Sequence, residues 1–185
     1  MNTYPDFNIE NGVLELYTGD ETNVIIPNSV TSIGEYAFCY CSNLTSIEIP
    51  NSVTSIGDGA FYDCSKLTSV EIPNSITSIE KGVFWGCLNL TKVKIPKSVT
   101  SIKKFAFRYC SNLTSIKIPS SVTTIGEKAF ESCKCLTSIE IPSSVLYIGC
   151  DAFYGCSSLK TIKLPESCEC DEYWNYGCNA EIIYY

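Results

Sequence analysis

Cysteine is the residue type in this chain with the widest range of possible chemistry. Thiolates can act as nucleophiles, bind zinc or form disulfides. Six of the twelve cysteines recur at a fixed step of 23 residues: Cys41, Cys64, Cys87, Cys110, Cys133 and Cys156. If the chain folds with this period, their S–H groups can donate to buried loop carbonyls, while their Cβ vectors run parallel and disfavour disulfides. We therefore predict a reduced, structural ladder of thiols.

The other six cysteines do not follow this step: Cys39, Cys135, Cys150, Cys168, Cys170 and Cys178. A structural zinc site usually needs about four ligands with C-x2-C spacing. The segment 166–185 offers three cysteines and a C-x-C spacing, so we expect no metal and no cofactor. A disulfide within this segment stays open as an alternative. A reduced ladder favours a reducing compartment.

Histidine is absent from the sequence. This absence removes the commonest general base and excludes Ser-His-Asp and Cys-His mechanisms. There is no Gly-rich phosphate loop, and the neighbouring carboxylates of Asp171 and Glu172 have no evident catalytic partner. We predict that the protein is not an enzyme.

Positive charge is concentrated in one segment of a chain whose formal net charge is -7. Between Glu80 and Glu127 there is no acidic residue, but there are eight basic ones: Lys81, Lys92, Lys94, Lys97, Lys103, Lys104, Arg108 and Lys117. Such a band can bind an acidic protein, a sulfated glycan or a phosphate backbone. The alternative is a solvated surface paired with Glu71 and Glu140. The acidic total argues against a dedicated nucleic-acid binder.

The 23-residue step extends to three other residue types, which makes it a structural repeat. Seven prolines follow it: Pro27, Pro50, Pro73, Pro96, Pro119, Pro142 and Pro165. So do six phenylalanines: Phe38, Phe61, Phe84, Phe107, Phe130 and Phe153. So do six leucines: Leu44, Leu67, Leu90, Leu113, Leu136 and Leu159. No single unit can bury its own apolar face, so the units must stack.

One unit, LTSIEIPNSVTSIGDGAFYDCSK, divides into three predicted elements. In residues 44–50, Ile47 and Ile49 alternate with polar residues, which is the strand period, and proline ends the strand. Residues 53–57 are rich in β-branched side chains and predict a second strand. Residues 60, 61 and 64 share one face only at helical spacing, so we predict one helical or 3-10 turn there.

The first strand of each unit is expected to expose two columns of side chains. One column holds Ser46, Ser69, Lys92, Ser115, Ser138 and Thr161, and the other holds Glu48, Glu71, Lys94, Lys117, Glu140 and Lys163. From these columns, Glu48, Glu71 and Glu140 join the eight residues of the basic band as the candidate partner-binding residues. In the third element, Tyr62, Trp85 and Tyr154 share a column with Cys39, Arg108 and Glu131. Such aromatic side chains either anchor an interface or cover the turn beneath them.

The pattern LxxIxIPxxVxxIGxxAFxxC resembles the BspA-like, or Treponema-type, class of leucine-rich repeats over about residues 22–165. Three residues depart from it: Val83 replaces alanine, and Glu80 and Lys103 replace glycine, which puts the turns of two units in doubt. The resemblance implies a curved solenoid with a strand-lined face and a role in adhesion or protein recognition, often at microbial surfaces. It implies no enzymatic activity.

The expected fold is an α/β leucine-rich-repeat solenoid, horseshoe-like, with stacked parallel β-strands and short helical or 3-10 turns, mostly β by content. We expect a single domain over 1–185. Residues 1–21 form an N-terminal hairpin cap turning at Asn11-Gly12, residues 22–165 hold the repeats, and residues 166–185 form a C-terminal cap that closes with a strand.

The expected function is non-catalytic macromolecule binding, with protein recognition or adhesion through the exposed sheet face or the basic band of residues 81–117. The expected partner is a protein or glycan, including anionic ones, and not a specific nucleic acid. The alternative is a structural or adhesive spacer of a microbial surface protein. We expect a monomer without a transmembrane segment. The N-terminus lacks a signal peptide, which favours the cytoplasm, whereas the resemblance implies the cell surface or secretion.

Overall fold

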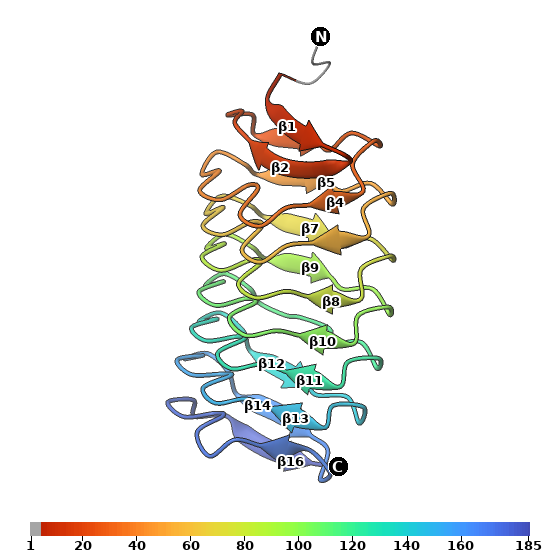
Figure 1. Cartoon of the computed structure of the whole chain (residues 1–185). Coiled ribbons are helices and arrows are strands. Elements are labelled where there is room, and N and C mark those ends of the chain that lie inside the picture. The colour runs from red at the N-terminus through yellow and green to blue at the C-terminus, as the bar shows by residue number, and fades with distance from the viewer. Residues whose placement is uncertain (1–4) are drawn as a thin grey trace.

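A computed structural model describes residues 5–185 as seven coils stacked along one axis (Figure 1). We number the coils by their repeat units: coil 1 (21–43), coil 2 (44–66), coil 3 (67–89), coil 4 (90–112), coil 5 (113–135), coil 6 (136–158) and coil 7 (159–181). Each coil carries two short strands and a run of turns, except that coil 5 has only the second strand, and three faces run the length of the stack. The predicted solenoid of stacked parallel strands is confirmed.

The first strands of successive coils pair in parallel and form what we call the first face. They are β3 (Asn23–Ile25), β5 (Ser46–Glu48), β7 (Ser69–Glu71), β9 (Lys92–Lys94), β12 (Ser138–Glu140) and β14 (Thr161–Leu164), with β16 (Glu181–Tyr184) paired beyond β14. The order is β3-β5-β7-β9 in one sheet and β12-β14-β16 in another. The interruption falls at coil 5, where residues 115–118 form no strand.

The second strands form the second face in the same way. They are β4 (Ser32–Ile33), β6 (Ser55–Ile56), β8 (Ser78–Ile79), β10 (Ser101–Ile102), β11 (Thr124–Ile125), β13 (Tyr147–Ile148) and β15 (Glu169–Cys170). The parallel register is one coil per step, as in Ile102 opposite Ile125. Both strands predicted for each repeat are therefore present in every coil except coil 5, which lacks the first strand.

An antiparallel hairpin precedes the first coil, as the Asn11-Gly12 pair predicts. Strands β1 (Phe7–Glu10) and β2 (Val13–Tyr17) pair across these two residues. Asn11 and Gly12 have φ angles of 50° and 82°, the left-handed conformation that a two-residue hairpin turn of this type requires. Because β2 also pairs in parallel with β4, the hairpin continues the second sheet.

The core is a stack of like residues, as the period predicts. The six phenylalanines of the repeat are fully buried. Neighbouring rings along the stack lie parallel or nearly so, with centroids 5.2 to 5.6 Å apart from Phe38 to Phe153. At the C-terminal end, Trp174 packs edge-on against Phe153 at 5.9 Å. Offset aromatic stacking of this kind adds to the area that each ring buries.

The helical or 3-10 turn predicted in each coil takes a different form, and no residue from 5 to 185 is helical. In coil 1, the amides of residues 37, 39 and 41 donate to carbonyls three residues back, as in a 3-10 turn. The alternate amides of residues 36, 38 and 40 donate to coil 2 instead. Tyr36 and Tyr40 adopt φ angles of 54° and 60°, which a helix cannot contain. Hydrogen bonding between coils therefore replaces a continuous helix on this side, which we call the turn face.

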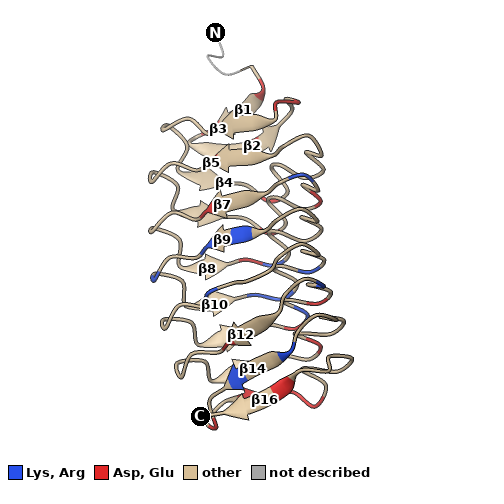
Figure 2. Cartoon of the chain, turned by 180° about the vertical axis from the view of Figure 1, so that it is seen from behind, with Lys and Arg blue, Asp and Glu red and all other residues tan. Residues whose placement is uncertain are grey.

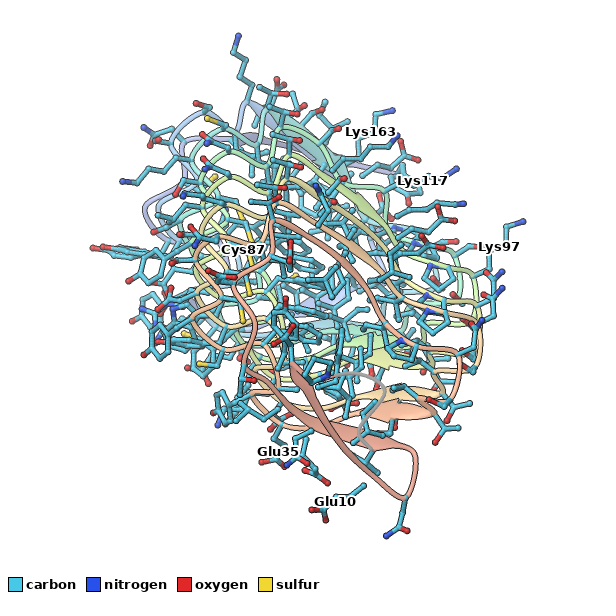
Figure 3. All side chains as sticks on the ribbon, turned by 90° about the horizontal axis from the view of Figure 1, so that it is seen from above. Glu10, Glu35, Cys87, Lys97, Lys117 and Lys163 are labelled. Atoms are coloured by element: carbon cyan, nitrogen blue, oxygen red, sulfur yellow. The ribbon has the colours of Figure 1, made fainter. Side chains whose placement is uncertain are left out.

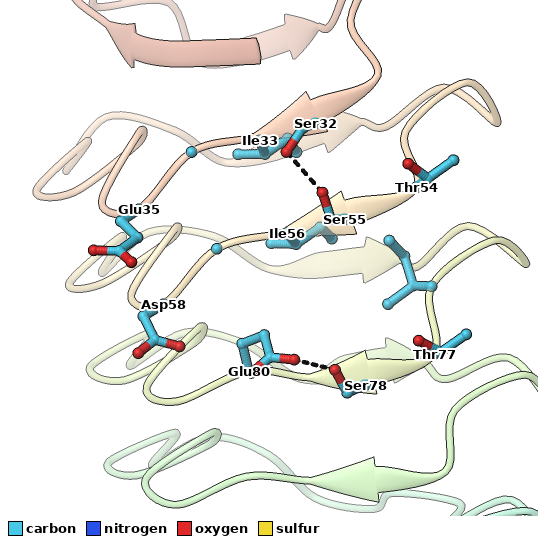
Figure 4. A pocket seen from close by; sticks show the side chains of 13 residues that line it. Ser32, Ile33, Glu35, Thr54, Ser55, Ile56, Asp58, Thr77, Ser78 and Glu80 are labelled. Carbon is cyan, nitrogen blue, oxygen red and sulfur yellow. Dashed lines mark hydrogen bonds between the residues drawn. The ribbon is translucent and has the colours of Figure 1, made fainter.

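The replacement of glycine by glutamate at residue 80 coincides with a break in the second sheet. The amide of Gly57 donates to the carbonyl of Ile33 at 2.8 Å, and a Cβ at Gly57 would lie only 2.7 Å from the Glu35 nitrogen. Glu80 occupies the equivalent place in coil 3, where its carboxylate accepts a hydrogen bond from the Ser78 hydroxyl (Figure 4). Strands β6 and β8, on either side of this point, belong to separate sheets. The replacement at Lys103 has no such effect, because β8 and β10 pair normally.

Candidate interaction surface

The three faces carry different chemistry. A view down the stack shows Lys97, Lys117 and Lys163 on one side, Glu10 and Glu35 on another, and Cys87 toward the remaining side (Figure 3). Because the main chain turns twice within each 23-residue unit, residues about ten apart in sequence face different directions. Sequence proximity therefore does not bring the basic residues of 81–117 onto one surface.

The first face holds seven of the candidate partner-binding residues. Lys92 and Lys94 project from β9, and Lys97 and Lys117 lie on the same side of the stack (Figure 3). The three acidic candidates belong to neighbouring coils: Glu48, Glu71 and Glu140. All seven side chains are exposed. The lysines of β9 lie next to the carboxylate of β7 (Figure 2).

Two cross-strand ion pairs use part of this charge. Lys94 pairs with Glu71, and Lys163 lies 3.6 Å from Glu140. Among residues 5–185, Lys92, Lys97 and Lys117 have no acidic partner within 4 Å. These three cations remain available for an external anion.

Three other candidates, Lys81, Lys103 and Lys104, are exposed on the second face. They line a pocket of about 560 Å³ together with acidic residues, Asp58, Glu80 and Glu127. Positive and negative side chains therefore alternate on this face. Another pocket of the second face, about 510 Å³ beside the break at Glu80, is lined by serine, threonine and acidic side chains, among other residues (Figure 4).

Arg108, the eighth basic residue, lies on the turn face and is committed to internal contacts. One guanidinium nitrogen lies 2.8 Å from a carboxylate oxygen of Glu131, and their side chains are 20% and 7% exposed. The guanidinium carbon lies 4.6 Å from the ring centroid of Trp85 and 4.7 Å from that of Tyr109. A desolvated cation between two aromatic rings is a stabilising contact. The structure thus divides the basic residues of 81–117 among three faces.

The cysteine column lies inside the turn face. Each thiol from coil 2 to coil 6 donates to the carbonyl of the phenylalanine 26 residues earlier, from Cys64 to Phe38 O at 3.0 Å through to Cys156 to Phe130 O at 3.1 Å. Burial raises the pKa of the Cys110 thiol far above its ordinary value, and the pKa of Cys41 at the edge of the column rises to about 11 for the same reason. All twelve cysteines are free thiols, so the column has the features of a packing device.

Residues 5–185 bring together no group of three or more Cys, Asp or Glu side chains able to hold a metal ion. Within the same residues, no helix is long and apolar enough to cross a membrane.

Comparison with known proteins agrees with the repeat. The family model of the BspA type leucine rich repeat region matches residues 9–136 and 77–185, with six copies. A comparison with functionally curated proteins finds no significant match.

Several solved bacterial structures are similar. A leucine-rich repeat protein of Treponema pallidum shares 31% identity and a TM-score of 0.80 over 83% of this chain and 75% of its own. One from Eubacterium ventriosum shares 30% identity and a TM-score of 0.83 over 95% of this chain and 48% of its own, so the chain spans about half of that protein. One from Bacteroides ovatus shares 26% identity and a TM-score of 0.66 over 93% of this chain and 58% of its own. By both its repeat and its fold, the chain belongs to the BspA-type leucine-rich repeat family.

Proposed function

We propose that this protein is a non-catalytic binding module that recognises an acidic protein surface through its first face. The observation that carries the proposal is the group of exposed cations without an ion-pair partner, Lys92, Lys97 and Lys117, on the first face at coils 4 and 5. Membership in a repeat family with a strand-lined face supports a binding role.

The geometry around the three lysines favours a protein partner. Lys92 projects from β9, whose backbone pairs in parallel with β7 on the coil 3 side, while Lys97 and Lys117 lie outside any strand on the same face. Lys117 itself lines a hollow of about 460 Å³ between coils 5 and 6, together with Ser115, Ser138 and Glu140. A rigid face with both positive charge and a hollow can complement the shape and charge of a folded protein surface. Charge complementarity mainly accelerates association and selects among partners.

The second and turn faces are weaker candidates for an anionic partner. On the second face the lysines share their pocket with three carboxylates. On the turn face Arg108 is already paired with Glu131. The first face thus offers the positive charge that internal contacts compensate least.

Charge reversal on matched faces tests the proposal. The triple variant Lys92→Glu/Lys97→Glu/Lys117→Glu should lose a partner captured from an extract of the source organism, as measured by quantitative mass spectrometry. The control Lys81→Glu/Lys103→Glu/Lys104→Glu makes the same change in net charge on the second face and should keep that partner. Titration of the purified partner should show affinity falling steeply with salt for the wild type. Equal retention of every captured protein by both variants would refute the first-face assignment.

A structural or adhesive spacer is the second candidate, favoured by the continuous stacked core, which makes a stiff rod. A cell-surface or secreted location is part of either proposal and rests on the family. A spacer predicts that neither triple variant changes any specific capture.

A further inference from the structure

The turn face carries a continuous cluster of aromatic side chains over coils 1 to 4, which we call the aromatic strip. It consists of Tyr36, Tyr40, Tyr62, Trp85, Phe105 and Tyr109. Ring centroids are 6.3 Å apart for Tyr36 and Tyr62, 5.6 Å for Tyr40 and Tyr62, and 5.4 Å for Tyr62 and Trp85. Trp85 continues the strip to Phe105 at 5.1 Å and to Tyr109 at 6.3 Å. The rings therefore form an unbroken line along the axis of the solenoid.

The strip is exposed, narrow and limited in area. Tyr36, Tyr40 and Tyr109 are 47%, 67% and 37% exposed, and the other three rings are partly exposed. At about 200 Å² per ring residue, the exposed aromatic area is on the order of 300–500 Å². A standard protein interface covers about 800 Å² on each partner. The strip alone therefore suits an extended chain better than a globular surface.

Internal contacts hold the strip in place before any ligand binds. The Tyr36 ring lies over Gly59, where a Cβ would approach it to 2.3 Å. At the other end, Arg108 packs between Trp85 and Tyr109 and is fixed by Glu131. Rings whose rotamers are fixed in this way lose little conformational entropy on binding.

The backbone under the strip is not available for strand addition. The amides of Tyr36 and Tyr40 donate to coil 2, and those of Asp63 and Gly86 donate to the next coil in turn. A peptide that binds by β-strand addition needs an unpaired strand edge. The groups left to recognise a ligand are the ring faces, the tyrosine hydroxyls and the Asp63 carboxylate, which lies over Gly86.

We propose that the aromatic strip binds a neutral, linear polysaccharide that lies along the solenoid axis. The C–H faces of successive sugar rings stack on Tyr40, Tyr62 and Trp85, and the sugar hydroxyls bond to tyrosine hydroxyls and Asp63. A neutral ligand fits because the strip has little net charge. Arg108 is paired with Glu131, and the carboxylate of Asp63 and the ammonium of Lys104, 5.9 Å from the Phe105 ring centroid, add one charge of each sign. In coil 5, Lys128, Glu131 and Ser132 replace aromatic residues in the three outward columns and end the strip.

Trp85 provides a direct reporter of binding. The chain has one other tryptophan, Trp174, which is 9% exposed and packs on Phe153. In a Trp174→Phe background, addition of dextran, laminarin or galactomannan, three soluble neutral polysaccharides, should shift the Trp85 emission for at least one of them. Affinity electrophoresis in gels containing the same three polysaccharides should show a matching retardation.

Single substitutions then locate the site. Loss of one stacked ring should weaken the affinity about threefold for Tyr40→Ala and about tenfold for Trp85→Ala. Tyr40→Ala removes a largely exposed side chain, so it tests the strip even if Trp85→Ala unfolds. Tyr184→Ala is the matched control, because Tyr184 is similarly exposed, at 60%, but lies in β16 on the first face.

The results of these binding experiments distinguish the aromatic strip from the first face as the polysaccharide site. Retention of polysaccharide binding by the variant Lys92→Glu/Lys97→Glu/Lys117→Glu supports two independent surfaces. Failure of all three polysaccharides to bind, or equal binding by Tyr40→Ala, Trp85→Ala and the wild type, overturns the proposal. If the strip variants instead lose the acidic protein partner, the strip is part of a protein interface and the polysaccharide proposal is wrong.

Discussion

Replacement of Phe107 by alanine tests whether stacked like residues hold the solenoid together. The Phe107 ring is fully buried and lies between Phe84 at 5.5 Å and Phe130 at 5.4 Å. Removal of a buried phenylalanine side chain costs about 3–5 kcal/mol, because its transfer free energy is lost and a cavity remains. Two stacking contacts are lost at once, so we expect the upper part of that range.

The measurement is urea denaturation followed by circular dichroism, with a thermal melt as a second readout. At about 2–4 °C per kcal/mol for a chain of this size, a loss of about 4–5 kcal/mol should lower the melting temperature by about 8–20 °C. Tyr40→Ala, an exposed ring outside the stack, should change the free energy of unfolding by less than about 0.5 kcal/mol. A loss of under about 1 kcal/mol for Phe107→Ala, with an unchanged m-value, would refute the account of the core.

Three further predictions concern other parts of the stack. Gly126→Ala should destabilise the fold by about 1–3 kcal/mol, because its Cβ would lie 2.5 Å from the backbone nitrogen of Lys104; an unchanged urea midpoint would contradict this. Glu131→Ala should lower the free energy of unfolding by about 3 kcal/mol, because it leaves the partly buried guanidinium of Arg108 unpaired. Glu140→Ala breaks an exposed pair and should cost under about 1 kcal/mol; equal urea midpoints for the two variants would contradict this difference. Burial raises the folded-state pKa of the ladder thiols. As the pH rises, these thiols therefore lose their protons in the unfolded chain before they do so in the folded one. The free energy of unfolding should fall above about pH 9, by up to about 1.4 kcal/mol per pH unit for each thiol. Urea titrations at several alkaline pH values should show a shallower fall for Cys110→Ala, and parallel curves would exclude the thiols as the cause.

The position that the repeat pattern assigns to glycine shows which features of the fold the pattern can predict. Gly126 and Gly149 leave room for the backbone of the preceding coil, and the second sheet is continuous there. At Glu80 the sheet is interrupted, while at Lys103 it is not, although both residues depart from the pattern. The sequence could identify the two deviant turns but not their different outcomes, because these depend on how each side chain packs against the coil before it.

The sequence alone was sufficient to determine the coil length, both strands of every coil except coil 5, the N-terminal hairpin and the buried phenylalanine stack. These features follow from a one-dimensional period, since every coil packs only on its neighbours and equal coil lengths place like residues over like. Only the tertiary structure decided that the turns alternate between local and intercoil hydrogen bonds. It also decided that Arg108 makes internal contacts, whereas Lys92, Lys97 and Lys117 have no ion-pair partner. Finally, it joined six aromatic residues from three different columns into one strip. These features occupy outward positions where residue types vary from coil to coil. No period marks them, and their contacts depend on side-chain direction and on the neighbouring coil.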